Sequence, residues 1–124
     1  MATNAFIYDQ TVNRAIYVHF DGHTVGETLS QHYTSQEKID ALISLGDVSE
    51  LGSEVHPPEG SGHSFATPEP GVTVFYGRDR GEDGCGPRRL GFQPRDPVAY
   101  LSRIYSTAEF GYVWNGSQWT AHRL

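Results

Sequence analysis

Two short hydrophobic segments near the start of the chain, residues 4–8 and residues 14–20, read as β-strands, and the second alternates between two kinds of side chain. Side chains point alternately to the two faces of a strand, so the second segment has an apolar face and an opposite face that carries Tyr17 and His19. The intervening residues 9–13 are rich in turn-forming types. The pattern predicts an N-terminal β-hairpin with one face in the core.

The next two segments have apolar residues at helical spacing, and each opens with a threonine. Thr24 precedes Glu27 by three residues, and Thr34 precedes Glu37 by three. This is the spacing of a capping box, in which the hydroxyl and the carboxylate each accept a free backbone N–H of the first turn. Gly46 follows the second segment and can end it in the left-handed conformation. We expect two short helices in succession.

The middle of the chain has little periodicity. Residues 47–71 are rich in Gly, Pro, Ser and Glu and predict a long surface loop, which compact domains seldom keep without a use for it. The run VTVFY at residues 72–76 predicts a β-strand. Residues 77–95 hold several arginines and glycines and predict a second loop.

The last third of the chain predicts a helix and a hairpin. Asp96 followed by Pro97 is typical of a helix start, because the carboxylate caps the first turn and proline lacks the N–H that would be unpaired there. Residues 109–114 and 117–122 then read as two strands. They are separated by Asn115–Gly116, a dipeptide that hairpin turns favour.

The predicted element order, β-β-α-α-β-α-β-β, indicates an α+β fold. We expect one domain over residues 1–124, with a mostly antiparallel sheet of about five strands and three helices on one face. The other face of the sheet would then present Tyr17 and His19 to solvent, to a ligand or to a second copy of the chain.

Composition narrows the class of protein. The chain has 124 residues, a mass of 13.7 kDa and one cysteine, which excludes an internal disulfide framework and a cysteine-based zinc site. No apolar run reaches the roughly 18 residues of a membrane span, and the first ten residues lack the features of a signal peptide. We therefore expect a soluble protein of the cytoplasm, with no membrane partner.

Charge divides the chain into two unlike parts. Residues 1–71 hold ten acidic and two basic residues, a balance of -8, whereas residues 72–124 hold five acidic and seven basic residues, a balance of +2. Eight of the nine basic residues are arginine, which suits bidentate contact with carboxylate or phosphate. The overall charge of -6 argues against bulk binding of nucleic acid. These features favour a focused anion site.

A cluster of metal-binding residue types follows the second strand. His19, Asp21 and His23 form the pattern H-x-D-x-H, and His32 lies in the next predicted helix. Imidazole and carboxylate groups at alternate positions of an extended segment are typical of a Zn²⁺ or Mn²⁺ site. The alternative is an ordinary turn, since Asp followed by Gly is a common turn signal. We favour this alternative and predict no metal and no cofactor.

Two further patterns indicate a ligand site. Arg78 and Arg80 alternate on a glycine-rich loop and can reach one anion together, although the neighbouring acidic residues can equally neutralise them. Tyr17 and His19, joined across the sheet by Tyr112 or Trp114, offer flat surfaces for a nucleobase, although aromatic residues in strands are often core. The candidate ligand-binding residues are Tyr17, His19, Asp21, His32, Arg78 and Arg80. No catalytic residue is assigned.

The chain resembles a group of small uncharacterised proteins of phages and prophages. Those proteins share a strand ending in HWDG, a helix finishing in HY and a second helix closing with LI-x-LGD-x-S-x-L. The matching positions here are His19, Asp21, Gly22, Gly26, Leu29, His32, Tyr33, Leu42, Ile43, Leu45, Gly46, Asp47, Ser49 and Leu51. Phe20 departs from the family, which usually has Trp at that place. The residues 76–82 and the C-terminal EFGYVWNGSQW are similar to later family segments.

The resemblance implies an accessory protein made by a virus in a bacterial cytoplasm. We expect a binding protein, with a counter-defence role, that contacts a host protein or sequesters a small anionic, nucleotide-like ligand. The alternative is a metal-dependent phosphoesterase or nuclease that uses His19, Asp21 and His32, with Arg78 or Arg80 stabilising developing charge. A third hypothesis is a structural protein that forms a homo-oligomer.

Overall fold

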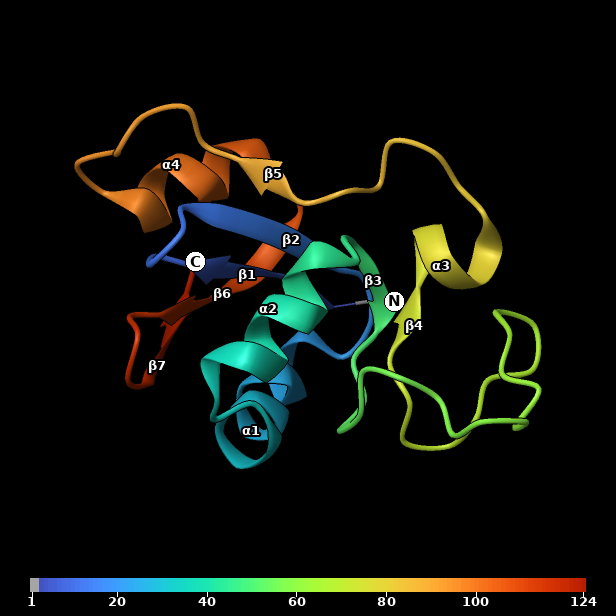
Figure 1. The fold of residues 1–124 in the computed structure, drawn as a ribbon. Helices are drawn as coiled ribbons and strands as arrows, with labels where there is room; N and C mark the ends of the chain where they lie inside the picture. The colour runs from blue at the N-terminus through green and yellow to red at the C-terminus, as the bar shows by residue number, and fades with distance from the viewer. Residues whose placement is uncertain (1–2) are drawn as a thin grey trace.

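The computed structural model describes residues 3–124 as one sheet with helices on both faces (Figure 1). The elements in chain order are β1 (Asn4–Asp9), β2 (Arg14–Val18), α1 (Gly22–His32), α2 (Gln36–Ser44), β3 (Val48–Glu50), β4 (Val74–Phe75), α3 (Tyr76–Arg80), β5 (Arg88–Arg89), α4 (Pro97–Ile104), β6 (Ala108–Trp114) and β7 (Trp119–Arg123). No helix among residues 3–124 has the length and apolar character that a membrane crossing requires.

The sheet is mixed but mostly antiparallel, as predicted. Its strands follow the order β4-β3-β2-β1-β6-β7, and β5 pairs with the start of β2. The two parallel pairings join β1 to β6 and β2 to β3, and the remaining pairings are antiparallel. The α+β class is confirmed. The predicted count of about five strands is too low, because β3 and β5 lie within segments predicted as loops.

Helices cover both faces of the sheet, so the prediction of three helices on one face is wrong. The core beneath α1 and α2 contains Ile7 of β1, whereas Phe6 and Tyr8 of the same strand pack with Leu101 of α4 on the opposite face. The physical reason lies in β1, where every residue from Ala5 to Asp9 is buried. A strand at the centre of the sheet needs a hydrophobic layer on each side.

The helix starts differ from the predicted capping boxes. Thr24 lies inside α1, and the helix begins at Gly22, after Asp21 in the left-handed conformation (φ 57°). Gly22 is required there, because a Cβ would approach the Thr3 carbonyl oxygen to 2.9 Å. In α2 the cap is Ser35 rather than Thr34, and its Oγ accepts the backbone N–H of Lys38 at 3.2 Å.

The two predicted loops are partly structured. Residues 47–71 include β3 and then run as an irregular loop, seen beside α3 and β4 at the right of Figure 1. The predicted strand 72–76 is shorter than expected, because Tyr76 already begins α3. The Asp79 side chain accepts the Phe75 backbone N–H at 2.8 Å, which helps to turn the chain into this helix.

The helix and the hairpin predicted for the last third are confirmed. Asp96 caps α4 by accepting the Ala99 backbone N–H at 3.1 Å, with Pro97 as the first helical residue. The strands β6 and β7 pair in a continuous antiparallel register. Gly116 takes the left-handed conformation in the connecting turn (φ 103°), whereas Asn115 caps the turn through its side chain.

Candidate functional site

Arg78 serves the fold and leaves little of its guanidinium for a ligand. Its Nε and Nη2 donate to the Asp79 carboxylate at 2.8 and 3.1 Å. Nη1 donates to the carbonyl of Val55 at 2.6 Å, and Nη2 donates to that of Thr73 at 2.9 Å. The guanidinium also lies over the Phe75 ring, 4.7 Å from its centre. These contacts tie the loop before β4 to the start of α3.

Arg80 does not share the partners of Arg78, and the extended loop on which this pair was predicted to reach one anion is a helix in the structure. Arg80 is exposed, forms an ion pair with Glu82 at 3.5 Å and lies over the Phe65 ring. The reason is that α3 is helical, and residues two apart on a helix point in different directions, unlike residues two apart on an extended loop.

A buried histidine completes the arrangement around Asp79. His63 Nε2 lies 3.2 Å from Asp79 Oδ2, and its Nδ1 accepts the Glu69 backbone N–H at 2.9 Å. Both side chains are at most 5% exposed. Burial raises the pKa of Asp79, but hydrogen bonds from Arg78, Phe75 and His63 outweigh it and hold that pKa below its usual value. We call His63, Arg78 and Asp79 the loop clasp.

The residues predicted as metal ligands lie apart. Asp21 and His23 are exposed at the start of α1, and His32 is exposed at its end. A helix rises 1.5 Å per residue, so about 15 Å of helix axis separates Gly22 from His32. Within residues 3–124, no three His, Cys, Asp or Glu side chains gather closely enough to hold an ion.

Tyr17 and His19 belong to an aromatic row on the sheet face that carries α4. The Tyr17 ring stacks on Tyr105 with centroids 6.0 Å apart, and Tyr105 stacks in turn on Phe6 at 5.9 Å. His19 lies 6.2 Å from Tyr17 and meets Phe20 edge-on at 4.4 Å. Tyr17 and His19 are half-buried, and Phe20 is 43% exposed. The row therefore remains open at its His19 end.

The residues predicted to lie beside Tyr17 and His19 across the sheet are not their neighbours in the structure. Tyr112 and Trp114 belong to the core beneath α1 and α2, on the other face from Tyr17. Tyr105, which follows α4, takes their place. Its position after the helix could not be read from strand periodicity, because it comes from a different layer of the fold.

The arginine beside this row is Arg88. It lies opposite Ala15 in the pairing of β2 with β5, and its guanidinium is 5.8 Å from the centre of the Tyr105 ring. Arg88 is exposed and makes no ion pair within 4 Å among the residues that the structure describes. We call Tyr17, His19, Arg88 and Tyr105 the aromatic surface. The sequence run PRRL, residues 87–90, contains β5 and was the one signal that could have indicated a short edge strand at this place.

The Asp47 carboxyl group contacts the backbone of the strand that carries the aromatic surface. Its Oδ1 accepts the Tyr17 backbone N–H at 3.0 Å, and burial raises the pKa of its carboxyl group, with the Arg88 charge acting in the opposite direction. Burial also raises the pKa of Tyr105 to about 12, so its hydroxyl stays protonated at neutral pH. The surface thus combines the Arg88 guanidinium with a row of aromatic rings.

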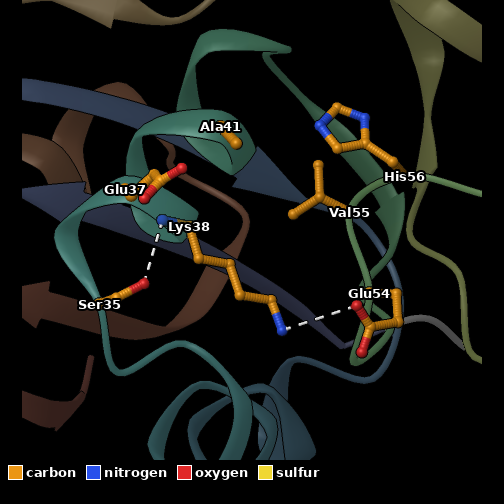
Figure 2. A pocket seen from close by; sticks show the side chains of 7 residues that line it. All are labelled: Ser35, Glu37, Lys38, Ala41, Glu54, Val55 and His56. Atoms are coloured by element: carbon orange, nitrogen blue, oxygen red, sulfur yellow. Dashed lines mark hydrogen bonds and ion pairs between the residues drawn. The ribbon is translucent and has the colours of Figure 1, made fainter.

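A cavity of about 330 Å³ lies elsewhere, between α2 and the loop at residues 54–56 (Figure 2). Lys38 crosses it, donating to the Ser53 carbonyl at 2.6 Å and reaching Glu54 at 4.0 Å. The carboxylates of Glu37 and Glu54 line the same cavity, so it does not suit an anionic ligand. The ammonium group already has a carbonyl and a carboxylate of the chain as partners.

Comparison of the chain with protein-family models, with curated proteins and with solved structures found no match.

Proposed function

We propose that the protein binds a small anionic ligand that carries an aromatic ring, such as a nucleotide, on the aromatic surface. The observation that supports this most strongly is the position of Arg88, an exposed arginine without an ion pair among residues 3–124, beside Tyr105 in a row of stacked rings. The ring would stack near Tyr17 and His19, and the phosphate would pair with the guanidinium.

The spacing along β2 suits such a ligand. Arg88 is level with Ala15, and Tyr17 and His19 follow on the same face at two-residue steps. Four residues of strand advance about 13 Å. A nucleotide extended along the strand can therefore place its base near His19 while its phosphate reaches Arg88.

The energetics favour a ligand that uses both ends of the surface. Stacking of a base on an aromatic side chain contributes about 1–3 kcal/mol. A hydrogen bond to a charged group contributes about 1.5–3 kcal/mol. Neither contact alone gives tight binding, so a nucleoside or a free phosphate should bind more weakly than a nucleotide.

The biological setting of this proposal rests on the resemblance to phage proteins. A phage product that sequesters a nucleotide signal in the host cytoplasm would interfere with a host defence without catalysing a reaction. Contact with a host protein through the same surface is the other form of that proposal. Asp21 and His32 lie at opposite ends of α1, so no observation favours the metal-dependent enzyme over the binding protein.

Isothermal titration calorimetry with the full chain tests the proposal. The ligands are linear and cyclic nucleotides, the matching nucleosides and inorganic phosphate. We expect binding of at least one nucleotide. The variant Arg88→Gln should weaken that binding about 10-fold or more, and His19→Ala should weaken it by about 5-fold or more.

The matched control is Arg89→Gln. Arg89 is the neighbouring residue of β5, is equally exposed, and lies opposite Arg14, so its side chain points to the other face of the sheet. This variant changes the net charge by the same amount and should leave the affinity unchanged. Silence across the whole nucleotide panel, or an equal loss in both arginine variants, would overturn the proposal.

A further inference from the structure

The two end strands of the sheet, β4 and β7, differ in the length of backbone that they leave without a partner strand. At one end of the strand order, β4 is only two residues long and continues directly into α3. At the other end, β7 is five residues long and pairs with β6 without a register shift. It forms the rim of the sheet at the left of Figure 1. Proteins commonly protect an edge of this kind with proline or a bulge, and β7 has neither.

The backbone groups that face outward from β7 can be assigned. The Leu124 N–H donates to the Glu109 carbonyl at 3.0 Å, and the Asn115 N–H donates to the Gln118 carbonyl at 3.2 Å. In an antiparallel pair, alternate residues bond to the partner strand. Trp119, Ala121 and Arg123 therefore direct their N–H and C=O groups away from β6.

We propose that a second copy of this chain pairs with β7 in antiparallel fashion, with the twofold axis at Ala121. In this register Ala121 faces the partner's Ala121, and Trp119 faces the partner's Arg123. All outward-facing groups of both strands are then hydrogen-bonded, and the sheet continues through the dimer. Ala121 is exposed and small, so it does not obstruct the approach of the two strands.

The side chains in this register are complementary. Trp119, Ala121 and Arg123 pair with Trp114, Tyr112 and Phe110, so they share the sheet face that carries α1. The partner's Arg123 would lie beside the Trp119 ring, an arrangement that favours a cation–π contact. The bond from Trp119 Nε1 to the Tyr33 carbonyl at 2.8 Å already fixes that ring.

A groove beside β7 leaves room for this contact. The Trp119 ring lines a cavity of about 350 Å³ between α1 and the hairpin, together with Phe110 and Tyr112. A second cavity, of about 230 Å³, continues past Trp119 toward Ser117. The Trp119 ring is therefore not fully enclosed by its neighbours and retains surface for a further contact.

Charge does not oppose the pairing at the edge itself. β7 contains no acidic residue, and Arg123 is its one arginine. In the proposed register the two copies of Arg123 are four residues apart along the paired strands, or about 13 Å. This exceeds the screening length of about 8 Å at physiological salt, so their mutual repulsion is small.

Light scattering of the full chain after size exclusion, over a range of concentrations, tests the proposal. We expect a dimer of twice the 13.7 kDa chain mass. Ala121→Pro removes an N–H that β6 does not use, so the fold should persist while the dissociation constant rises about 10-fold or more. Ala121→Ser keeps that N–H and should remain dimeric. Arg123→Glu, at an exposed position, should weaken the dimer without affecting the fold.

Circular dichroism and thermal melting of each variant establish that it is folded. We expect a dissociation constant of about 1 μM. A wild-type chain that is still monomeric at about 100 times that concentration would overturn the proposal. So would a folded Ala121→Pro variant that dimerises as well as Ala121→Ser. A monomer that binds an extended peptide along β7 would assign the edge to a different partner and reject the second copy.

Discussion

Arg78 and Asp79, adjacent in the sequence, form a two-point ion pair in which Nε and Nη2 of the arginine contact both carboxylate oxygens. The Asp79 side chain is 5% exposed and the Arg78 side chain 21%. His63 closes the clasp from the loop, 3.2 Å from Asp79. The long loop rich in Gly and Pro therefore has a fixed attachment to α3.

Breaking the clasp should destabilise the protein and release the loop. Arg78→Gln would leave the Asp79 carboxylate without its main partner, at a cost of about 2–4 kcal/mol. Urea unfolding measures that loss, and hydrogen exchange should increase across residues 55–70. Arg80→Gln is the control, because its exposed ion pair with Glu82 contributes little. Equal stability of both variants would contradict the role given to the clasp.

Acid should weaken the protein partly through Asp79. The pKa of this carboxyl group is lower in the folded protein than its usual value of 3.8. The stability that it contributes is therefore present above 3.8 and is lost as the pH falls through the lower, folded-state pKa. Asp79→Asn should be less stable at neutral pH and should lose less stability between neutral pH and pH 3. An unchanged acid slope would contradict this assignment.

The sequence predicted the parts of the fold that depend on local signals. The two hairpins, α4 with its Asp96 cap and the left-handed Gly46 follow from strand alternation and from residue types that suit turns and caps. The sequence did not predict that α4 covers the opposite face of the sheet from α1. That placement depends on contacts between segments far apart in the chain. The unbroken apolar run of β1 was the one local sign of burial on both faces.

The candidate site was half predicted for the same reason. Tyr17 and His19 lie on the expected face of β2, since strand periodicity alone determines it. The arginine beside them is Arg88 rather than Arg78, because Arg78 was read on an extended loop that is in fact a helix. Composition indicated an arginine near the aromatic residues but could not indicate which one.

Gly46 should tolerate no side chain. It has φ 89°, and an added Cβ would collide with the Cys85 carbonyl oxygen. Gly46→Ala should therefore lower the free energy of unfolding by about 2 kcal/mol or more, from backbone strain and from the collision. Gly91→Ala, where a Cβ would meet nothing within 4 Å, should change stability by about 0.5 kcal/mol or less. Chemical denaturation of both variants measures the difference, and similar midpoints would contradict it.

Asp47 should give the opposite pH dependence from Asp79. Burial raises the pKa of Asp47 above 3.8 in the folded protein, so the folded state binds its proton more readily than the unfolded state does. Its contribution to stability is therefore largest below 3.8 and is lost as the pH rises through the raised pKa. Asp47→Asn keeps an oxygen that can accept the Tyr17 N–H and removes this titration. Urea unfolding at several pH values should show, relative to the wild type, a variant whose stability falls less as the pH rises from 3.8 toward neutrality. The same variant removes a negative charge near Arg88, so it should also bind an anionic ligand more tightly if the aromatic surface is the site. A wild-type pH slope in the variant would show that Asp47 does not carry the raised pKa.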